Sequence, residues 1–313
     1  MTKESLKPYL ENASKGFEDP KGGFDFYRGK VRDVFSKKDK MLISVSDRIS
    51  AFDRVLSSIP CKGQVLNEIA IYWFEQTADI IGNHIITKVS PRSSLVRKCE
   101  VLPLEIIVRG YLTGSAWRDY KKGEAISGIK LPSGLKLNCK FDGPLFTPST
   151  KEELGKHDQP ISYEEIVSSG LLEQDLIEEV KAAALALFKR GSDLAAERGL
   201  ILVDTKYEFG ILDGKLVVVD EMHTPDSSRF WYSDTYRELY NAEKPQRKID
   251  KEYFRQWLME KGFSGEGRAP EIPDEVRLEV AFRYIKAFEE ITGKDFVPQE
   301  DNFSLHDIEK ALS

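Results

Sequence analysis

LILVDTKYEFGILDGKLVVVDE, residues 200–221, is the stretch that decides the fold, because it predicts two strands joined by a tight turn. Bulky and charged residues alternate along its first half, so the charged side chains share one face of a strand. These charged residues are Asp204, Lys206 and Glu208. The second half is an apolar run, Leu216–Val219, that ends in Asp220 and Glu221. We therefore expect an antiparallel hairpin with one charged face.

The register of this hairpin decides whether Glu208 and Asp220 can act together. A two-residue turn at Asp213–Gly214 puts Glu208 opposite Val219 and Asp220 on the other face. A three-residue loop, Leu212–Gly214, puts both carboxylates on one face, diagonally about 7–8 Å apart at Cβ. We favour the second register, since two neighbouring carboxylates suit Mg²⁺ that is also held by phosphate oxygens and water. A solvated face of an antiparallel sheet is the alternative.

The segments on either side of the hairpin extend this interpretation. Before it, apolar residues at helical spacing predict a helix over 173–198 that ends at Gly199. After it, Arg229 lies beside two serines in the loop TPDSSRFW, residues 224–231. This arginine can fork onto a phosphate or carboxylate, or the loop can serve to pack its two aromatic residues into the core.

The rest of the chain predicts a mixture of short strands and helices. The predicted strands lie within 24–46 and at 84–89, 93–99 and 104–109. A stripe of apolar residues predicts a helix from about 64 to 81, and two more amphipathic helices are expected between 250 and 296. Residues 130–162 are rich in Gly and Pro with little periodicity, which predicts an ordered, packed loop.

The stretch YRGKVRD, residues 27–33, joins two of the predicted strands through a single glycine. Gly29 would let backbone N–H groups approach a phosphate, and Lys30 and Arg32 would add positive charge on one face. The stretch has neither a P-loop nor a dinucleotide-binding glycine pattern. An exposed hairpin with solvated basic residues is therefore the alternative.

A second basic stretch, Arg109–Ser115, follows an apolar strand and leads into a short helix predicted near 116–120. An arginine at a strand end, followed by glycine and hydroxyl residues at a helix start, suits an anionic ligand. A capped helix with a surface arginine is the alternative.

Two features of the loop 130–162 carry local predictions. Residues 150–153, TKEE, match a helix capping box. His157 and Asp158 form a candidate orienting pair, although a surface hydrogen bond is the commoner role for such neighbours.

Composition limits the classes of protein to which this chain can belong. Its 313 residues are 41% apolar and 31% charged, which is typical of a globular protein with two or three lobes. The net charge of −6 argues against nucleic acid as a main partner. Three scattered cysteines and an N-terminus without an apolar signal core predict free thiols and a cytoplasmic location. No membrane partner is expected, since apolar runs are too short to span a bilayer.

Six stretches, in the same order along the chain, together resemble the SAICAR synthetase family. They are RGKVRDVF, SVSDRISAFD, PLEIIVRGYLTGSAWRDY, GPLFTPSTKEELGKHD, LVDTKYEFGI and VVVDEMHTPDSSRFW. The resemblance implies a two-lobed α+β fold, similar to ATP-grasp and kinase-like folds, with antiparallel sheets and packed helices. We expect an N-terminal sheet lobe over 1–115, a larger ATP-grasp-like lobe over 116–245 and a C-terminal helical segment over 246–313.

The resemblance also implies roles for individual residues. Those expected to cover the ATP phosphates are Gly29, Lys30, Val31 and Arg32. Those expected to meet adenine through backbone groups are Glu100, Val101 and Leu102. The expected catalytic residues are Lys206, near ATP, with Glu208 and Asp220, which would hold Mg²⁺. Those expected to bind the imidazole nucleotide are Arg109, Ser115 and Arg229, and looser expectations concern Lys140, Asp204, His157 and Asp158.

The implied reaction consumes ATP and joins L-aspartate to a carboxyaminoimidazole ribonucleotide, giving SAICAR, ADP and phosphate. Transfer of the γ-phosphoryl group would turn an unreactive carboxylate into an acyl phosphate, which the aspartate amine would then attack. One alternative is a small-molecule kinase of similar shape, which would stop at phosphoryl transfer. Another is a non-catalytic nucleotide-binding protein. A monomer or small homo-oligomer is expected.

Overall fold

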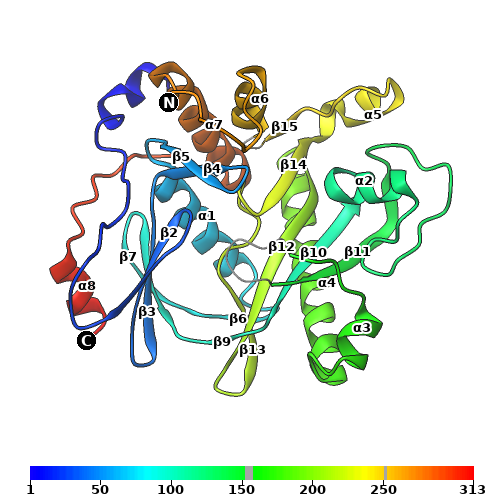
Figure 1. Ribbon diagram of the computed structural model, residues 1–313, viewed down its shortest axis with the longest axis horizontal. Helices are drawn as coiled ribbons and strands as arrows, with labels where there is room; N and C mark the ends of the chain where they lie inside the picture. Colours follow the sequence, from blue (N-terminus) through cyan, green and yellow to red (C-terminus); the bar gives the residue numbers. More distant parts are fainter. Residues whose placement is uncertain (152–157, 250–251) are drawn as a thin grey trace. The chain divides into compact units, whose positions relative to one another are not determined.

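The computed structural model describes residues 1–151, 158–249 and 252–313 (Figure 1). The chain divides into two compact units, each discontinuous in sequence. The first unit consists of Met1–Tyr72, His84–Lys98 and Asp250–Ser313, and the second of Trp73–Asn83 and Cys99–Ile249. The expected boundary after Ser115 therefore falls inside the second unit, and the C-terminal helices group with the first.

An antiparallel sheet of order β1-β2-β3-β8-β7 forms the centre of the first unit. Its strands are β1 (Asp25–Arg28), β2 (Arg32–Lys37), β3 (Lys40–Val45), β7 (Ile85–Ser90) and β8 (Ser93–Arg97). Phe35, Leu42 and Leu95 form one apolar cluster with Ile308 of α8 (Leu305–Ala311), which therefore packs on this sheet. The strands predicted in 24–46, at 84–89 and at 93–99 are confirmed.

Helices and a second hairpin complete the first unit. These elements are the 3-10 helix η1 (Glu4–Tyr9), β4 (Arg48–Ala51), β5 (Arg54–Ser58), α1 (Lys62–Gln76), α6 (Glu252–Glu260) and α7 (Asp274–Thr292). The predicted helix from about 64 to 81 is α1, which ends earlier than expected, at Gln76. Its residues from Trp73 on are assigned to the second unit. The two helices predicted between 250 and 296 are α6 and α7, and Gly293 ends α7 in a left-handed conformation with φ +68°.

The long strand β12 (Leu200–Leu212) organises the second unit, because β9, β10, β13 and β14 all pair with it. The sheet runs β11-β10-β12-β13-β6, and β15 extends it beyond β14. The other strands are β6 (Gly82–Asn83), β9 (Glu100–Val101), β10 (Leu104–Tyr111), β11 (Lys140–Thr150), β13 (Lys215–Val219), β14 (Ser228–Tyr232) and β15 (Lys248–Ile249). The described pairs are antiparallel except β13 with β6.

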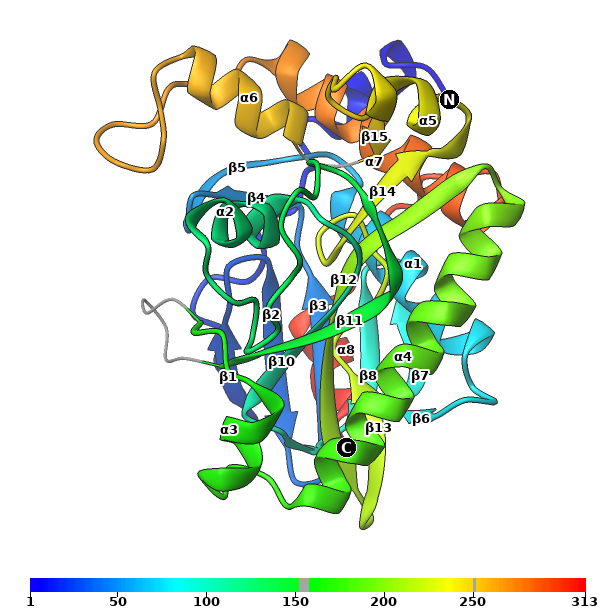
Figure 2. The same ribbon diagram turned by 90° about the vertical axis from the view of Figure 1, so that its right-hand side faces the viewer.

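Four helices accompany this sheet: α2 (Gly114–Lys122), α3 (Tyr163–Ser168), α4 (Gln174–Glu197) and α5 (Ser233–Asn241). Figure 2 shows α4 lying along the sheet, and its buried stripe confirms the helix predicted over 173–198. Gly110 of β10 makes room for the ring of Phe188 on α4, since a Cβ there would come within 3.2 Å of it. Among the helices that the structure describes, none is both long and apolar enough to cross a lipid bilayer.

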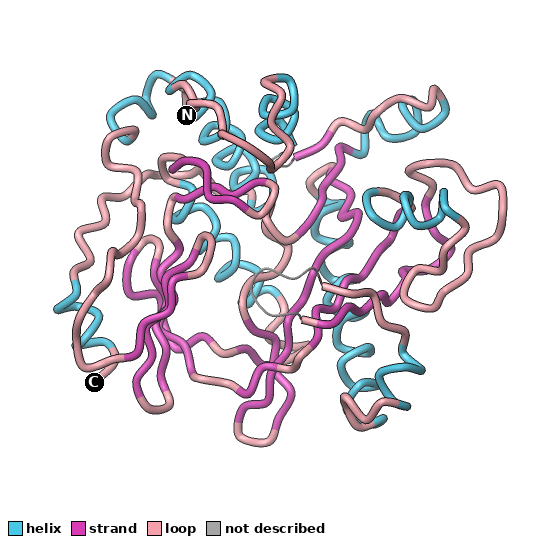
Figure 3. The backbone as a smooth tube through the Cα atoms, viewed as in Figure 1, coloured by secondary structure: helices cyan, strands magenta, loops and turns pink. Residues whose placement is uncertain are grey.

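The segment 130–162 is more regular than its composition predicts. It contains β11, which appears among the strands coloured magenta in Figure 3 and pairs with β10. The expectation of an ordered, packed loop is wrong for Lys140–Thr150, which form a strand. β11 lies at the end of the sheet order, where proline can replace a residue that would otherwise donate a hydrogen bond. Of the predicted capping box, Thr150 is the last residue of β11, and Glu152 and Glu153 lie outside the described residues, as does His157.

The β12–β13 hairpin adopts the two-residue register, so the three-residue loop that we favoured is wrong. Leu212 pairs with Lys215, and Glu208 lies opposite Val219. Asp213 and Gly214 both take positive φ, +52° and +73°. This is the conformation of a type I′ turn, whose twist matches that of the two strands it joins.

Candidate active site

Glu208 and Asp220 lie within electrostatic reach of the same ammonium group despite this register. β13 ends at Val219, and Asp220 takes a left-handed conformation with φ +67°. The alternation of a strand therefore no longer directs the Asp220 side chain. Its carboxylate acts electrostatically on Lys206, which also donates a hydrogen bond to Glu208. Both carboxylates therefore act on Lys206, although the register of the hairpin directs only one of them.

Two lysines hold the Glu208 carboxylate. Lys206 Nζ donates to Glu208 Oε1 and to Glu105 Oε1, the latter at 2.9 Å. Lys151 Nζ donates to Glu208 Oε2 at 2.5 Å. The Glu208 side chain is only 10% exposed, so both of its oxygens accept hydrogen bonds from ammonium groups where little solvent can compete.

Electrostatic effects keep Lys206 protonated in this cluster. Burial by itself lowers the pKa of Lys206, but the charges of Glu208, Asp220 and Glu105 outweigh burial and raise the pKa above its ordinary value. Burial raises the pKa of Glu105, and Lys206 partly opposes that rise. Lys206 is therefore a permanent cation among carboxylates.

This acidic cluster has the donor chemistry that a hard divalent cation prefers. Its carboxylates are Glu105, Asp158, Glu208 and Asp220, and its ammonium groups are Lys151 and Lys206. When all six groups are ionised, two negative charges remain in excess. Within residues 1–151, 158–249 and 252–313, no three His, Cys, Asp or Glu side chains converge to enclose a metal by themselves. The cluster therefore fits Mg²⁺, which needs only one or two carboxylates when phosphate oxygens and water complete its shell.

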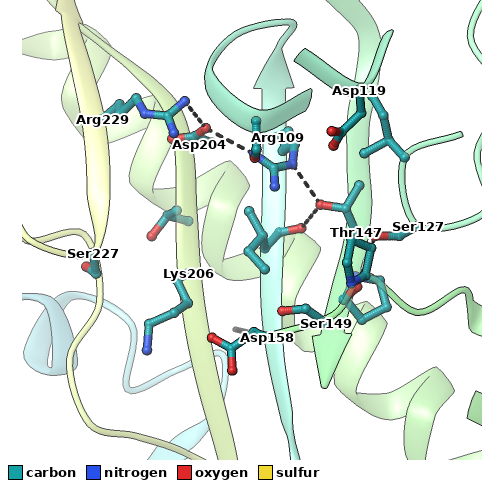
Figure 4. A pocket seen from close by; sticks show the side chains of 16 residues that line it. Arg109, Asp119, Ser127, Thr147, Ser149, Asp158, Asp204, Lys206, Ser227 and Arg229 are labelled. Atoms are coloured by element: carbon teal, nitrogen blue, oxygen red, sulfur yellow. Dashed lines mark hydrogen bonds and ion pairs between the residues drawn. The ribbon is translucent and has the colours of Figure 1, made fainter. Parts of the chain in front are cut away.

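A cavity of about 350 Å³ lies beside this cluster (Figure 4). Its charged lining residues are Arg109, Asp119, Asp158, Asp204, Lys206 and Arg229. Its hydroxyl residues are Ser115, Ser127, Thr147, Ser149, Thr205 and Ser227. Lys206 belongs both to the cavity lining and to the acidic cluster, so the two parts of the site meet at this side chain.

Asp204 orients the two arginines of the cavity, as the dashed lines of Figure 4 show. Its Oδ2 atom lies 2.9 Å from Arg229 Nη1 and 3.5 Å from Arg109 Nη1. Arg109 Nε also donates to Thr147 Oγ1 at 3.0 Å, and that hydroxyl donates in turn to the carbonyl of Ile107 at 2.8 Å. Two guanidinium groups share this one carboxylate, so Arg109 and Arg229 are held together at one end of the cavity.

The start of α2 adjoins Arg229. Gly114 has φ +60°, and a Cβ at this position would come within 2.2 Å of Arg229 Nη1. The backbone conformation therefore favours glycine at this position, and a larger residue would displace the Arg229 guanidinium packed against it. Ser115 follows in the first turn and lines the cavity, so a hydroxyl, a guanidinium and the first N–H groups of a helix lie together. Such an end of a helix favours an anion.

Hydrogen bonds also fix the loop that carries Arg229. Thr224 Oγ1 donates to Glu221 Oε2 at 2.7 Å, and Thr224 N–H donates to Ser227 Oγ. Ser228 Oγ donates to Thr205 Oγ1 of β12 at 2.7 Å. The alternatives that we left open for this loop are compatible: it buries Phe230 and Trp231 and also presents Arg229 to the cavity.

Several residues of this site were not predicted from the sequence, notably Glu105, Lys151, Asp119 and Thr147. Glu105 alternates with apolar neighbours on β10, which is the same signal that drew attention to Glu208. Lys151 was interpreted as part of a helix cap. Thr147 lies in β11, a strand that the composition hid. Lys140, a looser expectation, is the first residue of the same strand and is not among the cavity residues.

The basic hairpin of the first unit is confirmed as the turn between β1 and β2. Its Gly29 N–H donates to the Arg32 carbonyl at 2.8 Å. Arg48 donates to the carbonyls of Gly29 and Lys30 and forms a buried ion pair with Asp33 at 2.7 Å. Lys30 pairs with Asp53 at the surface. The hydrogen bonds from Arg48 therefore fix the backbone of this turn, which also contains Val31 and Arg32.

Glu100 and Val101 form β9 on the edge of β12, and both are exposed. Gly210 allows this approach, since a Cβ there would lie 3.0 Å from the Glu100 carbonyl oxygen. Leu102 is buried, and its N–H donates to the Phe209 carbonyl at 2.9 Å. These three residues therefore present backbone groups beside β12.

A buried tyrosine–histidine pair lies behind the acidic cluster. Tyr207, between Lys206 and Glu208 on β12, bonds through its Oη to His223 Nε2 at 2.6 Å. Both side chains are fully buried. Burial lowers the pKa of His223 from 6.5 to about 3, so its imidazole is neutral in the folded protein.

We expect His223 to make folding stability fall as the pH drops below about 6.5. Between about pH 6.5 and pH 3 the imidazole is protonated in the unfolded chain but neutral in the folded chain. The free energy of unfolding of the wild type therefore falls by up to about 1.4 kcal/mol per pH unit relative to a variant without this imidazole. Chemical denaturation of wild type and His223→Gln between pH 7 and 5 measures the difference. Parallel stability curves would contradict the assignment.

The fold and the cavity first define a class, namely proteins that bind a small anionic ligand beside a cationic lysine and an excess of carboxylates. The sequence matches the family model described as SAICAR synthetase over residues 25–271. A phosphoribosylaminoimidazole-succinocarboxamide synthase from Bacteroides thetaiotaomicron is 48% identical over 289 residues, which cover 91% of this chain and 92% of that protein. This chain belongs to the SAICAR synthetase family, and it is accordingly an ATP-dependent ligase of purine biosynthesis.

Solved structures of similar proteins agree with this family assignment. A SAICAR synthase from Saccharomyces cerevisiae, complexed with SAICAR, matches with a TM-score of 0.79 and 34% identity, covering 91% of this chain and 99% of that one. A SAICAR synthetase (type 2) in complex with ADP matches with a TM-score of 0.66 and 26% identity, covering 88% and 100%. The expected α+β fold is confirmed.

Proposed function

We propose that this ligase joins L-aspartate to the carboxyaminoimidazole ribonucleotide and releases SAICAR, ADP and phosphate. The observation that carries this proposal is the cavity of about 350 Å³, which has fixed guanidinium groups at one end and Lys206 at its border with the acidic cluster. A substrate with a phosphate at one end and a carboxylate at the other suits two such cationic positions. The SAICAR bound to the yeast relative and the ADP bound to another support it.

The phosphate of the nucleotide is proposed to bind where Arg229, Ser115 and the start of α2 come together. The guanidinium of Arg229 packs on Gly114, and the first N–H groups of α2 have no partners within the helix. Arg109 supplies a second fixed charge, and Asp204 keeps both arginines oriented. This arrangement favours a dianionic group over a neutral one.

Lys206 is proposed to bind the reacting carboxylate and the phosphoryl group that approaches it. Its ammonium stays charged, and it lines the cavity while bonding to Glu105 and Glu208. Phosphoryl transfer needs mainly positioning and charge neutralisation, which a fixed cation at the point of transfer supplies.

Glu208 and Asp220 are proposed to hold Mg²⁺. The excess of carboxylates around Lys206 and Lys151 supports this assignment. Bound Mg²⁺ would neutralise charge on the phosphate oxygens of ATP. If Glu208 held the cation, Lys151 and Lys206, which now donate to its two oxygens, would be free to donate to phosphate oxygens.

Two further groups are proposed to bind ATP. The hairpin Gly29–Arg32 of the first unit would contact the phosphates, supported by its two basic side chains and by the bracing from Arg48. Glu100–Leu102 of the second unit would meet adenine through backbone groups at the edge beside β12.

We also propose a cytoplasmic location, as expected from the sequence. Cys61, Cys99 and Cys139 are free thiols, which is typical of a reducing compartment.

The chemistry proceeds in two bond exchanges. A carboxylate oxygen of the nucleotide attacks the γ-phosphorus of ATP, the bond to the bridging oxygen breaks, and ADP leaves. The amine of aspartate, after losing a proton, then attacks the acyl carbon and expels phosphate, which carries the former carboxylate oxygen.

Substrate labelled with ¹⁸O in its carboxylate should therefore yield labelled phosphate, detected by mass spectrometry.

Release of ADP in the presence and absence of aspartate tests the proposal against a small-molecule kinase. We expect ADP release at full rate only when ATP, the nucleotide and L-aspartate are all present. A kinase would turn over the imidazole nucleotide without aspartate, and a non-catalytic nucleotide-binding protein would release no ADP in either mixture. Either result would contradict the proposed reaction.

A further inference from the structure

The hydrogen bond between Tyr207 and His223 connects the two segments that carry the acidic pair. Tyr207 follows Lys206 and precedes Glu208 on β12, and its side chain points to the opposite, buried face. His223 lies three residues after Asp220 in the loop that follows β13. The bond of 2.6 Å therefore joins the strand of Glu208 to the loop of Asp220.

Packing from other elements leaves the imidazole little freedom. The ring of Trp73 meets it edge to face with 4.5 Å between centroids. Gly191 of α4 makes room for it, since a Cβ there would come within 2.4 Å of His223 Cε1. Among the partners that the described residues offer, His223 Nδ1 has none, so Tyr207 provides the polar anchor of this ring.

The loop needs such an anchor because its backbone is unfavourable. Asp220 and His223 both take positive φ, +67° and +53°, a conformation that is uncommon for residues with a side chain, although Asp and His adopt it more often than most. Met222 between them is fully buried. The direction of the Asp220 carboxylate therefore depends on how the far end of this short loop is held.

We propose that the Tyr207–His223 hydrogen bond is a positioning device that sets the separation of Glu208 and Asp220, and thereby the affinity for the divalent cation. The inference rests on the proposed metal site. Tyr207 and His223 are fully buried and are not among the residues that line the cavity, so they act through the two carboxylates. Groups that orient metal ligands commonly change metal affinity by 10–100-fold when removed.

Binding of Mn²⁺ in the presence of saturating ADP, measured by electron paramagnetic resonance without turnover, tests the inference. Tyr207→Phe removes only the hydroxyl and should raise the dissociation constant of Mn²⁺ roughly tenfold. In turnover assays the same variant should need more Mg²⁺ for half-maximal rate and recover most of its kcat at high Mg²⁺. His223→Gln, whose amide can occupy the place of Nε2 and keep the bond to Tyr207, should bind Mn²⁺ within about threefold of wild type.

Tyr236→Phe is the matched control, since Tyr236 also donates its hydroxyl, to the Asn138 carbonyl at 2.9 Å, but lies outside the cavity lining and the acidic cluster. It should lose stability in thermal unfolding without a change in Mn²⁺ affinity. Unchanged Mn²⁺ affinity in Tyr207→Phe, with weakened binding in Glu208→Gln, overturns the positioning role alone. Unchanged affinity in Glu208→Gln overturns the metal site and the inference with it.

Discussion

Replacing Glu208 by Ala, or Asp220 by Asn, should lower turnover about 100-fold or more. Each change removes a fixed negative charge from the cluster around Lys206, and preorganised charges of this kind typically contribute 10²–10³ in rate. Folding should survive, because Lys206 keeps its bond to Glu105 in either variant. Steady-state ADP release at saturating substrates, alongside thermal unfolding, measures both expectations.

Glu243→Gln is a suitable control for this pair. Glu243 forms an ion pair with Lys136 at 2.7 Å on the surface of the same unit, so its loss removes a carboxylate of the same kind away from the cavity. Its turnover should stay within about twofold of wild type, as is usual for exposed pairs. If Glu208→Ala or Asp220→Asn behaved like this control, the metal assignment would be wrong.

Arg229→Ala should raise the KM for the imidazole nucleotide by about 10- to 100-fold, with a smaller change in kcat. A hydrogen bond to a charged group contributes about 1.5–3 kcal/mol, and this guanidinium is aimed and held by Asp204 at 2.9 Å. Its loss removes binding that substrate and transition state share, which appears in KM. Initial rates with the nucleotide varied at saturating ATP and aspartate measure the effect.

Arg190→Ala provides the comparison for Arg229. The two side chains are almost equally exposed, 35% and 36%, and each pairs with an aspartate, but Arg190 pairs with Asp79 outside the cavity. Loss of Arg190 should leave the KM for the nucleotide unchanged. An unchanged KM in Arg229→Ala as well would remove this arginine from the substrate site.

The sequence predicted the strands and long helices well, because their periodicity reflects which face is buried. The alternation around Lys206 and the stripe of α4 are examples, and both follow from contact with one core. β11 escaped prediction because its prolines lie in a strand at the end of the sheet order, where pairing on one side suffices. The division into units was not predicted because it depends on the pairing of β10 with β12, about 100 residues further along the chain.

The expected ligand-binding residues are close in space, although the geometry that brings others together was not predicted. Arg109, Ser115, Asp204, Lys206 and Arg229 all line the same cavity, which is compatible with a shared anionic ligand. The pairing of Glu208 with Asp220 was argued from the wrong register, since no pattern of residue types announces the left-handed backbone of Asp220. Lys151 and Glu105 were missed because their partner, Glu208, is distant in sequence.

The position of Lys206, shared by the cavity and the acidic cluster, has a thermodynamic consequence. A cation that engages Glu208 withdraws the counter-ion of this lysine, so its ammonium interacts more strongly with an anion in the neighbouring cavity. Coupling between two sites is reciprocal, and an occupied cavity must therefore change the affinity for the cation by the same factor. If Glu208 holds the cation as proposed, metal-bound nucleotide and the imidazole substrate should therefore bind cooperatively, with Lys206 as the side chain that couples the two sites.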